Sequence, residues 1–410
     1  MPNDQETLLK VEHLCQYFGR ADFKAVDDVS FDIKKGEVFG LVGESGCGKT
    51  TTGRAIIKLY NITSGNVYFK GIRIGAGIRS YQDAIKNARK EYKQKIEQAS
   101  GAEKDKLQSE LDAFIAAQKE EIKKAKFDQN NCDKEYQQKR TEELKARYAE
   151  KLASASGTEK AALQKEYKNE LNKAKKTKLV TQIQMIFQDP IASLDPRMTV
   201  REIIAEGLII QGVRDKEYID RKVYEILEMV GLTREHAGRY PHEFSGGQKQ
   251  RIGIARSVIM KPDMLIADEP VSALDVSIQA QVINLLNDLR DQLGLTILFI
   301  AHDLSVVKYF SDRIGVMYFG KMVELADSDE LFAHPLHPYT RSLLSSIPLP
   351  DPRTEKIRTR ITYNPLAAHD YSVDKPTLRE VLPGHYVQCN DAEFARYREE
   401  LGLSAETEQP

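Results

Sequence analysis

Short apolar runs bounded by polar turns recur in two parts of the chain. Within residues 1–80 and from residue 179 onward, alternating runs of this kind read as strands. They lie at 8–14, 25–33, 37–43, 65–71, 182–187, 264–267, 296–301 and 313–319. The stretch 277–293 has instead the period of an amphipathic helix. Alternation of short strands with helices is typical of a parallel sheet covered by helices, so the pattern predicts an α/β fold.

Residues 81–178 follow a different pattern. They are rich in Lys, Glu, Gln and Ala, contain no proline, and have glycine only at 101 and 157. Apolar residues recur three or four positions apart in two series, the first at 81, 85, 88, 92 and 96. The second series is at 107, 111, 114, 122 and 125, with the polar Gln118 at one of its positions. A narrow apolar seam of this spacing is typical of a coiled coil, so we predict an inserted α-helical coiled-coil hairpin region.

This region also repeats itself. The segment 99–104 reads Ala-Ser-Gly-Ala-Glu-Lys, and 155–160 reads Ala-Ser-Gly-Thr-Glu-Lys. Ser-Gly interrupts a helix and the residues after it restart one, so we predict two helical hairpins with Asn130-Asn131 as the turn between them. We expect a solvated, charged appendage without chemistry; the alternative is an arm that docks a partner protein.

Composition narrows the class of protein. The chain has 410 residues and a formal net charge of −1, which gives no global attraction to nucleic acid. The four cysteines have no close pair, which argues against a disulfide framework and a CxxC metal site. No apolar run approaches the roughly 20 residues that span a bilayer, and the acidic N-terminus lacks the apolar core of a signal peptide. The last stretch, 349–410, is rich in Pro, Arg and acidic residues and is expected to be a loosely folded tail.

A glycine-rich turn follows the apolar run 38–42. The segment 43–50 has the spacing G-x-x-x-x-G-K-[ST] of a phosphate-binding P-loop. Glycines let successive backbone N–H groups face one anion, and a helix that starts near Lys49 adds its positive end. Lys49 is expected to reach the β- and γ-phosphates of ATP, and Thr50 to ligate Mg²⁺. The residues expected to bind ATP here are Gly43, Glu44, Ser45, Gly46, Cys47, Gly48, Lys49, Thr50 and Thr51.

A second acidic element completes the expected chemistry. The wholly apolar run 264–267 ends in Asp268 and Glu269. Two carboxylates at the tip of a buried strand are costly unless they bind a metal or take part in catalysis. We therefore expect Asp268 to hold Mg²⁺ and Glu269 to act as general base toward the attacking water.

The segment 244–251, Phe-Ser-Gly-Gly-Gln-Lys-Gln-Arg, resembles the signature motif of ABC transporter ATPases. Further motifs follow in that family's order: Tyr17 and Phe18, Gln188, the D-loop residues Ser272, Ala273, Leu274 and Asp275, and His302. The resemblance implies a P-loop, RecA-like ABC ATPase domain with an antiparallel β subdomain and a helical subdomain. That domain would comprise 1–80 and 179–345, with helical hairpins inserted at 81–178 and a C-terminal tail at 346–410.

The same resemblance implies roles for these residues. Phe18, or its neighbour Tyr17, would stack on adenine. Gln188 would contact Mg²⁺ or the attacking water, and His302 would bridge Glu269 and the γ-phosphate. The signature residues Ser245, Gly246, Gly247 and Gln248 would open a helix that faces the nucleotide of an opposite subunit. Because the chain has one P-loop, the ATPase that completes its site would be a second chain.

Two longer segments narrow the resemblance. Residues 187–200 and 334–344 are similar to the ATPases of oligopeptide and dipeptide importers, closest to OppF-type subunits. The similarity implies a peripheral protein on the cytoplasmic face of the plasma membrane. Its partners would be a D-type ATPase paralogue in a heterodimer, two integral membrane permease subunits and an extracellular peptide-binding protein, with no nucleic acid.

One departure concerns the tail, where many relatives carry several cysteines. Here only Cys389 is present, and an iron–sulfur cluster needs about four thiolates, so we expect none. Two alternative functions stay open: the ATPase of a nickel-type importer, and a soluble ABC ATPase that acts on ribosomes or DNA. The single P-loop and the absence of aromatic platforms in the insert argue against the last of these.

Overall fold

The larger of two β-sheets carries the elements that matter for function. The computed structural model describes residues 6–19, 23–190, 192–347, 360–372 and 374–403. The strands of this sheet lie in the order β11 (Thr377–Leu382), β12 (His385–Cys389), β10 (Lys321–Asp327), β9 (Arg313–Tyr318), β3 (Val38–Val42), β8 (Thr296–Ala301), β7 (Met264–Asp268) and β6 (Ile183–Ile186). Strands β9, β3, β8, β7 and β6 are parallel, and the three beyond β9 are antiparallel.

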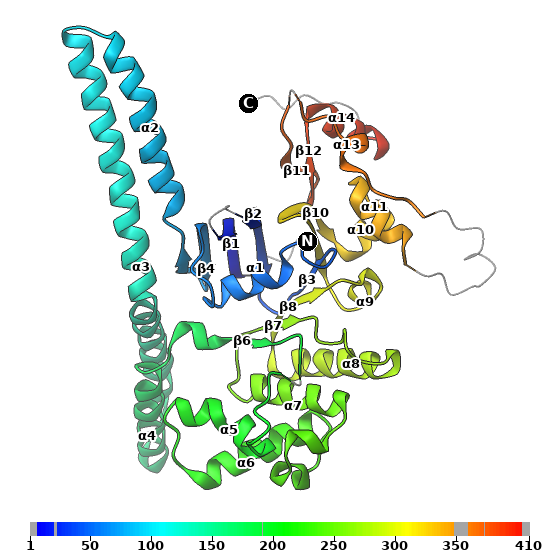
Figure 1. Ribbon diagram of the computed structural model, residues 1–410. Helices are drawn as coiled ribbons and strands as arrows, with labels where there is room; N and C mark the ends of the chain where they lie inside the picture. The colour runs from blue at the N-terminus through cyan, green and yellow to red at the C-terminus, as the bar shows by residue number, and fades with distance from the viewer. Residues whose placement is uncertain (1–5, 20–22, 191, 348–359, 373, 404–410) are drawn as a thin grey trace.

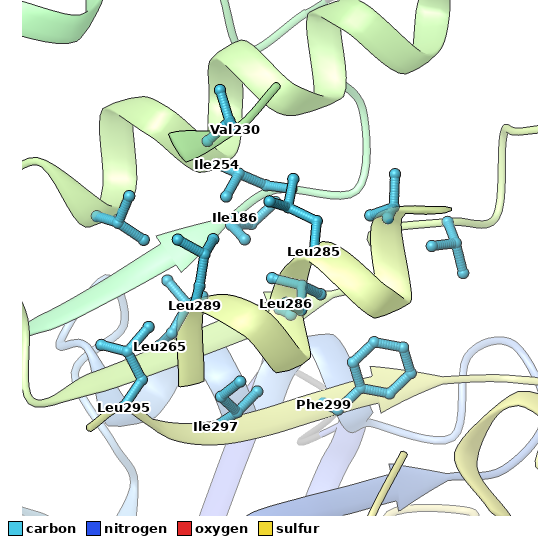
Figure 2. Close-up of a cluster of buried hydrophobic side chains, with 14 of the residues drawn as sticks. Ile186, Val230, Ile254, Leu265, Leu285, Leu286, Leu289, Leu295, Ile297 and Phe299 are labelled. Carbon is cyan, nitrogen blue, oxygen red and sulfur yellow. The ribbon is translucent and has the colours of Figure 1, made fainter. Parts of the chain in front are cut away.

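The central strands are buried on both faces, because helices pack on one face and helix α1 (Lys49–Ile56) together with the smaller sheet packs on the other. All residues of β3, β7 and β8 are buried, as their continuous apolar runs require. Figure 2 shows Leu285, Leu286 and Leu289 of helix α8 (Val276–Leu293) beside Leu265 and Ile297 of the sheet. The parallel strands therefore deliver their carboxyl ends to one common edge of the molecule.

A smaller sheet packs against the first. It is antiparallel throughout, with the order β2 (Phe23–Lys34), β1 (Thr7–Phe18), β4 (Ser64–Phe69) and β5 (Ile72–Ala76). Its buried side chains, such as Val11 and Val67, share one hydrophobic cluster with Leu41 of β3 and Ile266 of β7. The helix that follows the P-loop, α1 (Lys49–Ile56), contributes Ile56 to the same cluster.

A helical layer lies beyond the β6 side of the larger sheet (Figure 1). Its longer helices are α5 (Val200–Ile210), α6 (Lys216–Met229) and α7 (Gly246–Val258), joined by the short helices η2 (Arg234–Gly238) and η3 (Pro241–Glu243). The remaining short helices are η1 (Leu179–Gln182), α9 (Leu304–Lys308), α10 (Ser328–Ala333), α11 (Pro338–Ser345) and α13 (Pro365–Ala368). Thr199 and Ser245 cap α5 and α7 in reciprocal capping boxes, which explains why these helices begin where they do.

The insert consists of α2 (Arg79–Gln98), α3 (Ala102–Ser154) and α4 (Gly157–Ala174). Helix α2 packs along the first part of α3, and α4 packs along the last part (Figure 1). Both Ser-Gly repeats are the hairpin turns, as expected. The predicted turn at Asn130-Asn131 is wrong, because α3 is continuous through it.

Two physical reasons explain the continuous helix. Asparagine costs an α-helix only about 0.7 kcal/mol or less relative to alanine, and this pair has no glycine or proline beside it. The middle of α3 is also docked on the two sheets: Cys132 and Tyr136 are buried in the same cluster as Leu41. The ion pair between Arg73 and Asp128 holds this docked segment, with a shortest N–O distance of 2.5 Å. The middle of the insert is therefore part of the core, while its two ends project from it.

The expectation of a loosely folded tail is wrong for the described residues after 360. Strands β11 and β12 form a hairpin that extends the larger sheet past β10, and α14 (Asp391–Glu400) packs on it. Val381, Val387 and Tyr397 form a buried cluster there with Leu336 and Cys389. The alternation of apolar and polar residues around Pro-Gly at 383–384 was the signal for this hairpin. The part of the predicted tail at 349–359 lies outside the described residues.

Candidate functional site

The P-loop joins β3 to α1 at the carboxyl edge of the sheet. Gly43, Gly46 and Gly48 have φ values of 147°, 83° and 107°, which other residues adopt only with strain. A Cβ at Gly43 would lie 2.1 Å from the carbonyl oxygen of Met317, and one at Gly48 would lie 2.2 Å from that of Ala25. Both glycines are therefore required by close backbone approach as well as by conformation.

Lys49 lies inside the loop. Its side chain is buried, and its ammonium donates to the carbonyl oxygens of Gly43 at 2.7 Å and Glu44 at 2.9 Å. The Lys49 ammonium therefore lies inside the loop that the motif spacing predicts to surround a phosphate. Residues Glu44, Ser45 and Gly46 form the exposed rim of the loop, and Thr50 and Thr51 follow in the first turn of α1.

Cys47 is buried in the loop wall. Burial raises the pKa of its thiol, and the nearby Lys49 opposes that shift only in part. At neutral pH the side chain is a protonated, compact thiol, so the contribution of this residue to an anion site comes from its backbone N–H.

Asp268 lies at the end of β7 and is fully buried. Its Oδ1 accepts a hydrogen bond from the Thr50 hydroxyl at 2.8 Å, while its Oδ2 has no hydrogen-bond partner among the described residues. Desolvation raises the pKa of this carboxyl above its ordinary value, and the Thr50 hydrogen bond lowers it. An orphaned carboxylate oxygen beside a hydroxyl is the oxygen donor set that Mg²⁺ prefers, so these two residues fit the expected metal.

Three further predicted residues come together around Glu269, the residue that directly follows Asp268. Glu269 has φ of 45°, a left-handed conformation that is strained for a side chain of this size. Its Oε2 accepts from Gln188 Nε2 at 3.0 Å and lies 3.4 Å from Nδ1 of His302. A hydrogen bond from the Glu269 backbone N–H to the Ile300 carbonyl, 2.9 Å long, holds the strained residue in place. The structure therefore brings Gln188, Glu269 and His302 together.

The two aromatic residues at the end of β1 differ in their surroundings. The Tyr17 hydroxyl donates to Asp27 at 2.6 Å, and its backbone N–H donates to Thr63. The Phe18 ring is 37% exposed and packs edge-on against Tyr60. Because Phe18 is exposed while Lys24 and Arg79 lie over the Tyr17 ring, Phe18 has the better surface for stacking a base.

The signature residues begin helix α7. Ser245 accepts a hydrogen bond from the Gln248 backbone and its own N–H donates to Gln248 Oε1. Ser245 and Gly246 are exposed, and a Cβ at Gly247 would lie 2.7 Å from Ile278 of α8. This helix N-terminus therefore lies on the helical layer with its first residues exposed to solvent.

The D-loop follows Glu269 directly. The Ser272 hydroxyl donates to the Glu269 carbonyl at 3.1 Å, and Asp275 begins α8. Ala273 is exposed and Leu274 is half-buried. This turn therefore touches the backbone of the acidic residue and presents its outer face to solvent.

One residue beside the loop has no role in the predicted site. Tyr339 of α11 accepts a hydrogen bond from the Glu44 backbone N–H at 3.0 Å. It lies in the segment 334–344, whose similarity to a family motif was visible in the sequence. The contact itself joins residues almost 300 positions apart, so no local pattern could have found it.

Family models match most of the chain. The model for the ABC transporter family matches residues 26–164 and 149–272, and the model for the oligopeptide/dipeptide transporter C-terminal region matches 323–372. Among the described residues, none of the helices combines the length and the apolar character needed to cross a membrane.

Several curated proteins are similar over nearly their whole length. The oligopeptide transport ATP-binding protein OppF of Bacillus subtilis is 46% identical, with 96% of this chain and 99% of that protein covered. AmiF of Streptococcus pneumoniae, also an oligopeptide transport ATP-binding protein, is 42% identical over 97% and 99%. The dipeptide transport ATP-binding protein DppF of Lactococcus lactis is 43% identical over 93% and 92%.

Solved structures agree on the fold. The CbiO1 protein of Clostridium perfringens matches with a TM-score of 0.51 and 21% identity, covering 80% of this chain and 92% of that one. The ADP conformation of MJ1267, an ATP-binding cassette of an ABC transporter, matches with a TM-score of 0.50 and 20% identity, covering 80% and 96%. At these identities the likeness shows the fold alone.

Proposed function

This chain belongs to the ABC transporter family, among the ATP-binding proteins of oligopeptide and dipeptide transport, and from that premise we propose how its residues use ATP. It is the ATP-binding subunit of a peptide importer and an ATPase. The proposal depends on one observation above all: Gln188, Glu269 and His302 converge beside the buried pair formed by Thr50 and Asp268.

Binding begins at the P-loop. Its backbone N–H groups and the start of α1 surround the phosphates of ATP, and the Lys49 ammonium, held by the Gly43 and Glu44 carbonyls, donates its third N–H to them. The Thr50 hydroxyl and Oδ2 of Asp268, which has no hydrogen-bond partner among the described residues, would hold Mg²⁺. When bound, Mg²⁺ neutralises charge on the β- and γ-phosphates. Phe18 stacks on the adenine.

Hydrolysis uses the residues beyond Asp268. A water oxygen forms a bond to the γ-phosphorus while the bond from that phosphorus to the β,γ-bridging oxygen breaks. The Glu269 carboxylate accepts the proton of the water, and ADP and phosphate are the products. Gln188 orients the water, and His302 holds Glu269 and the γ-phosphate in register through the 3.4 Å contact already present.

The site is completed by a second ATPase. The residues of one chain that face the partner's nucleotide are Ser245, Gly246, Gly247 and Gln248 at the positive end of α7. We propose a D-type paralogue as this partner, two integral membrane permease subunits and an extracellular peptide-binding protein. ATP closes the two ATPases against each other on the cytoplasmic face of the membrane, and hydrolysis lets them separate.

The insert has its own proposal. We propose that 81–178 is a coiled-coil insertion into an ATPase domain formed by 1–80 and 179–345. The described side chains support this arrangement, since Leu111 is buried between α2 and α3 while Leu144 and Tyr148 are buried between α3 and α4. The outer surfaces of these helices are polar and exposed.

The function is tested by purifying the chain with the proposed permease subunits and reconstituting them in liposomes. Binding protein loaded with an oligopeptide or dipeptide should stimulate ATP hydrolysis and peptide uptake, and Glu269→Gln in this chain should abolish both. Stimulation by a nickel-loaded binding protein instead would assign a metal importer. Co-purification with ribosomes after detergent-free lysis, without permease subunits, would refute the transport assignment.

A further inference from the structure

Tyr339 of helix α11 contacts the P-loop from the segment 323–372 that matches the transporter C-terminal region, called the C-terminal region below. Tyr339 is 1% exposed, and its hydroxyl oxygen accepts the hydrogen bond from the Glu44 backbone N–H. That N–H belongs to the peptide unit whose carbonyl, on Gly43, accepts from the Lys49 ammonium at 2.7 Å. In a planar trans peptide the N–H and the C=O point in opposite directions within the plane. Lys49 and Tyr339 therefore hold opposite edges of one peptide unit.

Tyr339 is itself held in one position. Its ring centroid lies 4.4 Å from that of Tyr318, at the end of β9, and 5.5 Å from that of Tyr363. Burial raises the pKa of the Tyr339 hydroxyl, which keeps it protonated and neutral beside the loop. A neutral acceptor on a rigid ring fixes the peptide plane without adding a charge near the phosphates.

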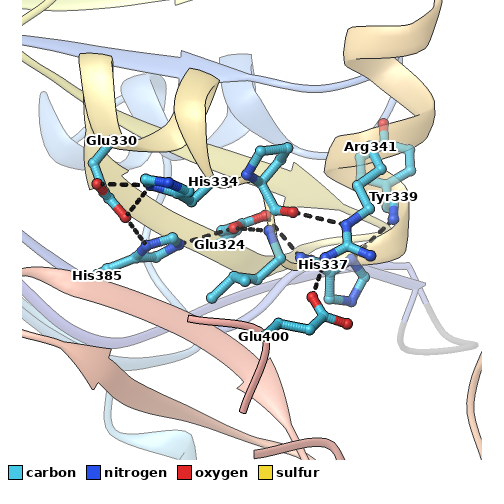
Figure 3. A network of polar contacts seen from close by, with 10 residues as sticks. Glu324, Glu330, His334, His337, Tyr339, Arg341, His385 and Glu400 are labelled. Atoms are coloured by element: carbon cyan, nitrogen blue, oxygen red, sulfur yellow. Dashed lines mark hydrogen bonds and ion pairs between the residues drawn. The ribbon is translucent and has the colours of Figure 1, made fainter. Parts of the chain in front are cut away.

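The start of α11 is tied to the core by a buried carboxylate (Figure 3). Glu324 of β10 accepts hydrogen bonds from the backbone N–H groups of Leu336 at 2.8 Å and His337 at 3.1 Å. His337 in turn accepts from the Tyr339 N–H through Nδ1 at 3.1 Å. Burial lowers the pKa of His337 to about 3, so this imidazole stays neutral and can accept at physiological pH.

The same carboxylate contacts the C-terminal hairpin. His385 of β12 lies 2.9 Å from Glu324 through Nε2, and Arg341 of α11 contacts Glu400 of α14 at 2.5 Å. Glu324 therefore connects the hairpin to the N-terminus of α11, and Tyr339 connects that helix to the P-loop. The path is continuous from the C-terminal hairpin to Glu44.

We propose that Tyr339 is a positioning residue for ATP binding, which fixes the Gly43–Glu44 peptide and through it Lys49. The inference rests on the proposed function, because it assumes that the P-loop holds ATP. It also gives the C-terminal region a direct part in the nucleotide site, because the contact of Tyr339 with Glu44 fixes the backbone conformation of the P-loop.

The test compares two buried tyrosines, Tyr339 and Tyr397. Tyr339→Phe removes the acceptor and keeps the ring, while Tyr397→Phe makes the same change in the cluster around Val387 and Cys389. The affinity of each purified chain for Mg²⁺ with the non-hydrolysable analogue AMP-PNP is measured by calorimetry. We expect Tyr339→Phe to weaken binding about fivefold, the effect of losing one hydrogen bond, and Tyr397→Phe to leave it unchanged.

Two further readouts separate positioning from general stability. In the reconstituted transporter, Tyr339→Phe should raise the KM for ATP with kcat unchanged. Hydrogen exchange of the nucleotide-free parent chain needs no variant: the Glu44 amide should exchange more slowly than those of Ser45 and Gly46. Unchanged affinity in Tyr339→Phe, or a Glu44 amide that exchanges as fast as its neighbours, would overturn the proposal. Failure of the parent chain to bind Mg²⁺ and AMP-PNP would instead refute the proposed function.

Discussion

The carboxyl edge of the sheet and the ends of the helical insert differ in how far their charged residues are buried and in how strained their backbone is. At the edge, Asp268 is buried with an oxygen unpaired, and Glu269 adopts a strained backbone conformation. At the outer end of the α2–α3 hairpin, the ion pairs between Lys95 and Glu91 and between Lys93 and Glu97 are solvent-exposed. Exposed pairs contribute only about 0–1 kcal/mol each. Buried charge and strained backbone therefore accompany the proposed catalytic residues at the edge, whereas the charged side chains at the hairpin end are solvated.

The middle of α3 belongs with the core rather than with its own ends. Tyr136 is buried there and Lys70 lies 5.3 Å from its ring centroid, while the Leu179 N–H donates to Asp133 at 2.8 Å. The molecule therefore has three kinds of region: the strained edge that carries the proposed catalytic residues, the docked segment of α3, and the two projecting hairpin ends. Each kind of region predicts a different response to mutation.

The largest effect is expected at the edge. Glu269→Gln keeps the hydrogen bond with Gln188 but removes the carboxylate that accepts the proton of the water. Turnover should fall by roughly a thousandfold while ATP binding persists and a closed ATPase dimer accumulates. Phosphate release and nucleotide binding are measured in the reconstituted transporter. Glu235→Gln, an exposed change in the helical layer, is the control. Turnover at the parent rate in Glu269→Gln would remove the general-base assignment.

The second effect tests the docked segment. Tyr136→Ala should lower the free energy of unfolding by about 3 kcal/mol, because it empties a site in the core shared with the ATPase sheets. Phe127→Ala, in the same helix but at a side chain that is 65% exposed, should change it by less than about 0.5 kcal/mol. Chemical denaturation of the nucleotide-free chain measures both. Equal, small losses would show that α3 is not docked in solution.

The third prediction concerns Asp268→Asn, which should raise the free energy of unfolding and lower the affinity for nucleotide. Asp268→Asn removes a desolvated charge whose native pKa is raised, so at neutral pH the ionised carboxylate costs stability that the amide does not. The nucleotide-free chain should gain about 1 kcal/mol of unfolding free energy, while its Mg²⁺-dependent affinity for AMP-PNP falls. The same denaturation assay and calorimetry test both halves. A variant that is less stable than the parent chain would contradict the account of Asp268 as a desolvated, metal-directed carboxylate.

Much of this organisation was visible in the sequence, for identifiable reasons. The P-loop and the Asp268–Glu269 pair were found because glycine spacing and an apolar run ending in carboxylates are local patterns. The helices of the insert were found because their seam is periodic. The turn at Asn130-Asn131 was wrong because docking of Cys132 and Tyr136 on distant strands decides the path of α3. Likewise, the role of Tyr339 depends on a contact with Glu44 that only the fold creates.

The smallest effect is expected at the projecting ends. Replacing residues 91–110 with a short Gly-Ser linker removes the outer part of the α2–α3 hairpin but keeps the docked segment around Tyr136. Since the removed part contains exposed pairs such as Lys95 with Glu91, the melting temperature should change by no more than about 1–2 °C and AMP-PNP affinity should not change. Deleting all of 81–178 is a harsher experiment, because it also uncovers the core that Cys132 and Tyr136 occupy.

The outer truncation also decides what the hairpin is for. An appendage without chemistry predicts normal ATP hydrolysis and normal peptide uptake in the reconstituted transporter. A docking arm predicts retained hydrolysis with reduced uptake or loss of a co-purifying partner, because the removed residues 91–110 include none of the proposed ATP-site residues. A drop in stability as large as that of Tyr136→Ala would show instead that the insert folds as one unit with the core, and the division into docked middle and independent ends would be wrong.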